Sequence, residues 1–296
     1  MTARDYWGYF FGPEFGGVLL LAIGLICVRR QLSFTRDGLI PLGRALVPLA
    51  LAVFGAEHLT SAQNLIQMVP SWMPARLFWA YFVGFALIAA ALSIASGKYV
   101  RWSSTLLGFM LLLFVLCIHV PNVAAHPRDR FAWAVASRDT LFALGAWALT
   151  GTLIKAHRLI TVCRVVIALV LLLFAVEHFL HPQCLPGVPL EQQTPGWIPL
   201  RSVWGFFEGV MLLAGGILIL IDKHARAAAT WLAVVTALMV ILLYIPLFVV
   251  ARKPVDVITA INYIADTLLF AGSILLLAAA IPAGEADLPA PAASAR

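Results

Sequence analysis

The sequence predicts an all-α, polytopic transmembrane protein, and three observations lead to this fold class. Hydrophobic residues make up 62% of the 296 residues and charged residues only 11%, against about 25% charged in ordinary soluble domains. Apolar runs of about 18–25 residues recur along the chain, and each is long enough to cross a hydrocarbon core about 30 Å thick. The runs are continuous, whereas strands of a membrane barrel alternate apolar and polar residues.

About nine membrane-spanning helices are expected. The first apolar run follows an aromatic stretch over residues 6–11, typical of the membrane interface, and ends at Val28. Arginines follow this run, whereas a cleavable signal peptide carries its positive charge before the apolar core, so we expect a retained helix. Eight further spans are expected at 43–64, 76–96, 102–121, 133–154, 161–180, 200–221, 227–250 and 256–281.

The basic residues predict the orientation in the membrane. The net charge is +6, but the basic residues form short groups at helix ends and not one patch, which argues against nucleic-acid binding. By the positive-inside rule the sequence predicts a plasma (inner) membrane protein with its N-terminus outside and its C-terminus in the cytoplasm. The cytoplasmic side would hold twelve of the 20 Lys and Arg residues: Arg29, Arg30, Arg36, Arg44, Lys98, Arg101, Lys155, Arg158, Arg164, Lys223, Arg226 and Arg296.

The four cysteines indicate no thiol chemistry. Cys27, Cys117, Cys163 and Cys184 include no Cys-x-x-Cys pair, which argues against a dithiol relay and against a thiolate metal site. We expect free cysteines in apolar surroundings. A bridge between Cys117 and Cys184 stays open, because both are expected on the same side of the membrane.

An internal repeat organises the chain. Phe-Gly-Ala-Glu-His-Leu at 54–59 matches Phe-Ala-Val-Glu-His-Phe at 174–179, and Trp-Met-Pro-Ala-Arg at 72–76 matches Trp-Ile-Pro-Leu-Arg at 197–201. Matches continue at Pro121 with Pro246 and at Asp139 with Asp266. Four regions follow: an N-terminal helix and loop (1–41), two four-helix units (42–155 and 156–281) and a disordered tail (282–296). An even number of spans per unit predicts parallel repeats.

Polar residues inside the expected spans locate a candidate site. A charged side chain at the centre of a membrane helix costs roughly 2.5–3.5 kcal/mol on insertion scales, so such residues bind something or pair with each other. Candidate proton acceptors are Glu57, His58, Asp139, Glu177, His178 and Asp266. Candidate substrate-binding residues near the same end of the helices are Trp72, Arg76, Trp79, His119, Trp197, Arg201, Trp204 and Glu208.

Two interpretations of these groups stay open. Each acid could simply pair with Arg76, Arg138 or Arg201, or with an imidazole, and brace the helices. Alternatively, acid and histidine could form a protonatable site for a quinol headgroup or a transported ion. A metal site is disfavoured, since adjacent residues such as Glu57 and His58 point about 100° apart on a helix. Haem between His58 and His178 is conceivable, but nothing else in the sequence favours it.

Each half resembles the DoxX-like family of small four-helix membrane proteins. The features that carry the resemblance are a first span ending in Glu-His, a loop with Trp-x-Pro, an aromatic second span with glycine, and an acid in the fourth span. The resemblance covers about 42–155 and 161–281. It implies a quinone-linked or redox-associated role, with quinone or a redox partner subunit as partner besides the lipid bilayer. The alternatives are a proton-coupled small-solute transporter and a non-catalytic structural subunit of a membrane complex.

Overall fold

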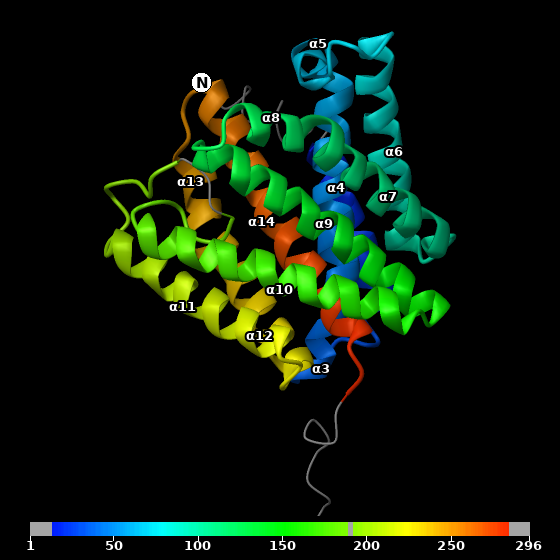
Figure 1. Ribbon diagram of the computed structural model, residues 1–296, viewed down its shortest axis with the longest axis vertical. Helices are drawn as coiled ribbons and strands as arrows, with labels where there is room; N and C mark the ends of the chain where they lie inside the picture. The colour runs from blue at the N-terminus through cyan, green and yellow to red at the C-terminus, as the bar shows by residue number, and fades with distance from the viewer. Residues whose placement is uncertain (1–13, 189–191, 284–296) are drawn as a thin grey trace, which may run out of the picture.

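The computed structural model describes residues 14–188 and 192–283 and confirms the all-α fold class (Figure 1). The described chain is 81% helical and contains no strand beyond one isolated bridge between Cys184 and Gln193. Seven of its helices are long and apolar enough to cross a membrane. The expected interfacial stretch 6–11 and all but the first two residues of the expected tail lie outside the described residues.

The long helices begin and end close to the expected spans. They are α2 (Glu14–Val28), α4 (Gly43–Thr60), α6 (Arg76–Ser96), α7 (Val100–Phe114), α9 (Arg130–Ile154), α10 (His157–Leu180), α11 (Arg201–Leu220), α12 (Ala225–Met239) and α14 (Pro254–Ala280). The short elements are α3 (Arg36–Leu39), η1 (Ile40–Leu42), α5 (Ala62–Leu65), η2 (Ile66–Met68), η3 (Val115–His119), α8 (Val120–Ala125), η4 (Val240–Tyr244) and α13 (Ile245–Val250).

Two of the nine expected spans are not among the seven apolar helices. The described part of α2 has only 15 residues, which is short for a membrane crossing. Helix α9 has 25 residues, but Arg138 and Asp139 in its middle lower its hydropathy. Both helices still pack within the bundle, α2 on α4 and α6, and α9 on α7, α10 and α14.

Local geometry recurs along the chain at the offset of the Trp-x-Pro motifs. Helices α11, α12 and α13 begin 125 residues after α6, α7 and α8. Both η3 and η4 are single π-helical turns, again 125 residues apart. The residues before α6 and α11, Ala75 and Leu200, have φ of 51° and 55°. The repeat read from the sequence thus has a counterpart in the backbone, while the division into two units stays a prediction.

The two halves interleave at the centre of the bundle. Helices α9 and α14, the last long helices of the two halves, pack on each other (Figure 1). Helix α4 of the first half packs on α14, and α10 of the second half packs on α9. The first helix of each half therefore lies against the last helix of the other half.

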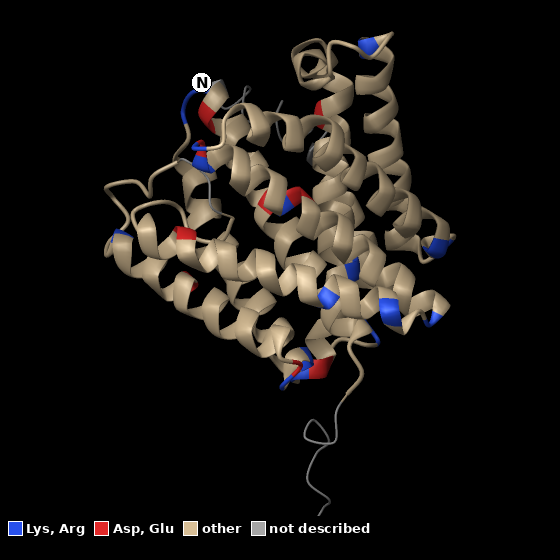
Figure 2. Cartoon of the chain, viewed as in Figure 1, with Lys and Arg blue, Asp and Glu red and all other residues tan. Residues whose placement is uncertain are grey.

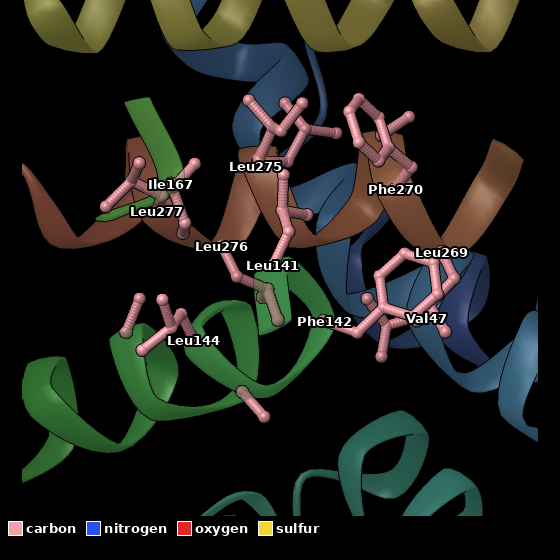
Figure 3. Close-up of a cluster of buried hydrophobic side chains, with 14 of the residues drawn as sticks. Val47, Leu141, Phe142, Leu144, Ile167, Leu269, Phe270, Leu275, Leu276 and Leu277 are labelled. Atoms are coloured by element: carbon pink, nitrogen blue, oxygen red, sulfur yellow. The ribbon is translucent and has the colours of Figure 1, made fainter. Parts of the chain in front are cut away.

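Small residues allow these helices to approach closely. A Cβ atom at Gly145 of α9 would lie 2.9 Å from the Cα atom of Ser273 on α14, and one at Gly272 of α14 would lie 2.8 Å from a methyl group of Val47 on α4. Close approach through glycine is typical of packed membrane helices. Around these crossings lie large buried side chains, including those labelled in Figure 3: Val47, Leu141, Phe142, Leu144, Ile167, Leu269, Phe270, Leu275, Leu276 and Leu277.

The antiparallel course of the helices gives the bundle two different ends. At one end, the basic end, α6, α9 and α11 finish and α4, α7, α10 and α12 begin. Two ion pairs join elements there, Arg226 with Asp37 at 3.1 Å and Arg164 with Asp222 at 3.4 Å. The opposite end, at which α4 and α10 finish, is the Glu-His end. Figure 2 shows charged residues at both ends and one mixed red and blue group in the middle of the bundle.

Candidate functional site

An arginine joins the two halves of the chain at the centre of the site. Nε of Arg138 on α9 donates to Oδ1 of the neighbouring Asp139 at 3.0 Å, and its Nη1 donates to Oδ2 of Asp266 on α14 at 2.7 Å. Both aspartates are buried, and the Arg138 side chain is 17% exposed. The pairing that the bracing interpretation expects for Arg138 is present, and both repeat-related acids share this one guanidinium.

A histidine on the π-helical turn extends the ion pair. Nε2 of His119 lies 2.8 Å from the second carboxylate oxygen of Asp139. Single π-helical turns displace the residues that follow them around the helix and are common at functional sites. Pro121 is the second residue after the turn and is compatible with the break, because proline has no amide hydrogen to donate to the helix ladder.

A second contact between the halves lies beside the first. Nδ2 of Asn262 donates to Oε1 of Glu57 at 3.2 Å, and Asn262 is one helical turn from Asp266 on α14. We define the polar cluster as Glu57, His119, Arg138, Asp139, Asn262 and Asp266. Within it three carboxylates face one guanidinium, so acidic groups are in excess.

The polar cluster forms one wall of a large cavity in the first half. The cavity has a volume of about 1200 Å³ and lies among α4, α6, α7 and α9, with α14 behind. Its walls are otherwise largely apolar, and they include Phe82, Leu106 and Phe109, which are about half exposed. The cavity therefore reaches the surface on the side of α6 and α7. The loop residues Met68 to Pro70 and Trp72 to Met73 line it at the Glu-His end.

His58 lines this cavity and uses one ring nitrogen in a hydrogen bond within its own helix. Its Nδ1 lies 2.8 Å from the carbonyl oxygen of Phe54, which can only accept, so Nδ1 carries the proton. No hydrogen bond from the described residues reaches its Nε2, and His58 lines the cavity. The side chain is fixed by α6, since a Cβ at Gly84 would lie 3.0 Å from the His58 Cβ.

The second half fills the corresponding space with its own chain. Its residues Cys184 to Val188 are all buried and form what we name the plug. The amide of Gly187 donates to Nε2 of His178 at 3.1 Å, and the hydroxyl of Tyr244 donates to the carbonyl oxygen of Pro186 at 2.5 Å. His178 and Tyr244 stand where the first half has His58 and His119.

The acid of the second Glu-His pair is also occupied. Oε2 of Glu177 accepts from Nη1 of Arg130 on α9 at 3.0 Å. This ion pair was missed in the sequence, because Arg130 is 47 positions away and begins a span without a distinguishing motif. Haem fits His178 poorly, since one ring nitrogen donates to the carbonyl of Phe174 and the other accepts from Gly187.

The expected tryptophans and arginines divide between the cavity and the surface. Trp72 and Trp79 line the cavity, and His119 does so as well. Arg76 donates to the carbonyl oxygens of Val69 and Ile66 and, among the described residues, forms no ion pair. Arg201 and Trp197 are exposed, and Arg201 also forms no ion pair with a described residue, so of the three candidate arginines Arg138 is the one that pairs with the acids. Trp204 donates to the carbonyl oxygen of Pro199, as Trp79 does to Pro74.

Glu208 lies away from the cavity. It is fully buried in the second half, where Thr236 donates to its Oε1 at 2.7 Å and no described residue forms a hydrogen bond with its Oε2. The cysteine expectation is partly corrected as well. None of the four cysteines, all of which lie in the described part of the chain, forms a disulfide, so there is no bridge between Cys117 and Cys184. The described residues contain no group of three His, Cys, Asp or Glu side chains that could hold a metal ion.

Comparison of the chain with protein-family models, with curated proteins and with solved structures finds no match.

Proposed function

We propose that this protein binds a lipid-soluble molecule in the first-half cavity, with the polar head of the molecule at Glu57, His58 and the polar cluster. The observation that carries the proposal is the cavity itself, about 1200 Å³, apolar on most sides and polar at one wall. Small-molecule sites commonly combine apolar walls with a few convergent polar groups in this way. An opening beside α6 and α7 would admit such a molecule from the bilayer.

The resemblance to the DoxX-like family favours a quinone or quinol as this molecule. Trp72 and Trp79 offer aromatic faces to a ring, and the acids and histidines offer proton acceptors for a quinol that is oxidised. In this proposal the protein is a redox-associated component of a plasma (inner) membrane, with its N-terminus outside and its C-terminus in the cytoplasm. It works with a redox partner subunit.

The experiment that tests this proposal is quinone binding to the purified full-length protein in detergent. We expect a short-chain ubiquinone to bind, as measured by calorimetry, and lipid-soluble quinone to co-extract with the protein. Ala86 lines the cavity on α6, so Ala86→Phe should weaken binding at least about tenfold by filling space. The control is Val210→Phe on the exposed face of α11. Equal affinity of the two variants would contradict the proposed site.

Proton-coupled transport of a small solute is a second candidate, favoured by the excess of carboxylates in the polar cluster. Acidic groups at membrane depth in transporters bind protons or cations during the cycle. Proteoliposomes test this alternative. Uptake of a solute that acidifies the lumen, lost in Asp139→Asn, would support transport over quinone binding.

A further inference from the structure

The two Glu-His motifs of the chain have the same local geometry but different neighbours. In both, Nδ1 of the histidine donates to the carbonyl oxygen four residues earlier, at 2.8 Å for His58 and 2.7 Å for His178. Both histidines also pack on a glycine of the following helix, Gly84 and Gly209 respectively. Each ring is therefore held by the same hydrogen bond to its own helix, and each helix packs closely on the next one at this level.

The second half shows what the free nitrogen of such a ring binds. Nε2 of His178 accepts a hydrogen bond from the backbone amide of Gly187, so this nitrogen is unprotonated and the ring is neutral. Gly187 has φ of 106°, and an added Cβ would lie 3.2 Å from Thr267, so the amide reaches the imidazole through a conformation suited to glycine.

The first half has no plug on its histidine. The loop after α4 turns away into α5 and η2 and is held there by Arg76, which donates to the carbonyl oxygens of Val69 and Ile66. This loop forms a wall of the cavity and does not enter it. Nε2 of His58 is thus an acceptor to which no described residue donates, on a side chain that lines the cavity.

We infer that the first-half cavity binds the hydroxyl-bearing, reduced form of its ligand, a quinol, and that a hydroxyl of this ligand donates to Nε2 of His58. The ligand hydroxyl takes the place that the Gly187 amide takes on His178. The inference rests on the proposed function and adds to it the redox form and the residue that recognises it. It also assigns different roles to the halves: the first binds the ligand, and the second is closed by residues 184–188.

The carboxylate of Glu57 also favours a ligand head that donates hydrogen bonds. It lines the cavity beside His58, and Asn262 satisfies only one of its oxygens. Arg138, the cation of this wall, directs its Nε and Nη1 donors to the two aspartates. A head that donates hydrogen bonds can pair with both His58 and Glu57, whereas the dicarbonyl head of a quinone only accepts.

Three probes that carry the same ring substituents test the inference on the purified full-length protein. They are short-chain ubiquinone, the corresponding quinol kept reduced under anaerobic conditions, and the dimethyl ether of that quinol, which cannot donate. We expect the quinol to bind about tenfold more tightly than the ether or the quinone, the effect of one buried hydrogen bond. The comparison of quinol, quinone and ether needs no variant, so it can be made even if a substitution impairs folding.

His58→Phe and the matched control His178→Phe separate binding from stability. The first should remove the preference for quinol, and His58→Gln, which keeps an acceptor, should restore part of it. His178→Phe should keep the preference but lower the melting temperature by about 2–8 °C, because the Gly187 amide is left without a partner.

The outcomes distinguish the two proposals. Equal binding of quinol, quinone and ether would overturn the inference while leaving the proposed cavity in place. A quinol preference that persisted in His58→Phe would mean that the methyl groups of the ether are excluded sterically, and would also overturn it. Failure of all three probes to bind would overturn the proposed function and the inference with it.

Discussion

At the scale of single residues, Arg138 is the side chain whose removal we expect to destabilise the protein most. Asp139 and Asp266 belong to different halves of the chain, and both depend on this one guanidinium. A buried ion pair is weak evidence for net stability, but removing one partner leaves an uncompensated charge and is strongly destabilising. Here the removal would take the arginine partner from Asp266 and leave Asp139 with His119 alone.

Arg138→Met should lower the free energy of unfolding by about 3–5 kcal/mol. Thermal unfolding in detergent, followed by circular dichroism, measures the change. Arg201→Gln is the control, because Arg201 is exposed and we expect a change within about 0.5 kcal/mol. Adding Asp266→Asn to Arg138→Met should recover part of the loss. A single variant as stable as the parent would show that the acids do not need this arginine.

Glu208 is the opposite case, because its surroundings contribute little to stabilise this buried acid. Glu208→Met should leave the free energy of unfolding within about 1 kcal/mol of the parent or raise it, since one carboxylate oxygen has no hydrogen-bond partner in the described part of the chain. Thr236 can turn back to a carbonyl of its own helix. Ligand binding should also be unchanged, since Glu208 lies outside the cavity. Loss of binding at intact stability would return Glu208 to the predicted substrate-binding set.

At the scale of elements, glycines set how closely the first two helices of each half pack. Gly84 of α6 faces α4, and an added Cβ would lie 2.8 Å from Leu59 Cδ2 and 3.0 Å from the carbonyl oxygen of Gly55. Gly209 of α11 faces His178 of α10 in the same way. The carbonyl oxygen of Gly55 is part of the backbone, so α4 and α6 would have to separate to accept a larger residue.

Gly84→Val should therefore destabilise the protein by about 1–3 kcal/mol and weaken ligand binding, because His58 packs on this glycine. Thermal unfolding and calorimetry on the same sample measure both effects. Gly196→Ala is the control, as an added Cβ there meets nothing within 4 Å. Unchanged stability of Gly84→Val would mean that the helix crossing has room that the contacts do not indicate.

At the scale of the whole molecule, the basic end predicts the orientation. Lys98 and Lys223 lie at this end, 125 residues apart and both exposed, whereas Arg128 lies exposed at the Glu-His end. In a Cys27→Ser background, a membrane-impermeant maleimide should label Arg128→Cys in intact cells. Lys98→Cys and Lys223→Cys should react only after permeabilisation. Labelling of Lys98 and Lys223 from opposite sides would contradict the parallel repeat.

The sequence by itself determined the fold class, the approximate ends of the spans and the repeat. These depend on local quantities: the length of an apolar run decides whether it can cross a bilayer, and Trp-x-Pro and Pro121 with Pro246 mark where helices start or bend. It also selected Glu57, His58, Asp139 and Asp266, because polar groups in apolar runs are conspicuous.

Only the tertiary structure decided which of these residues meet. Arg138 reaches Asp266 across 128 positions and Asn262 reaches Glu57 across 205, because the first helix of each half packs on the last helix of the other. The structure also made the halves unequal, with a cavity on His58 and a plug on His178. Nearly identical Glu-His motifs could not reveal this, since the difference lies in where the following loop goes, and that depends on packing between segments far apart in the chain.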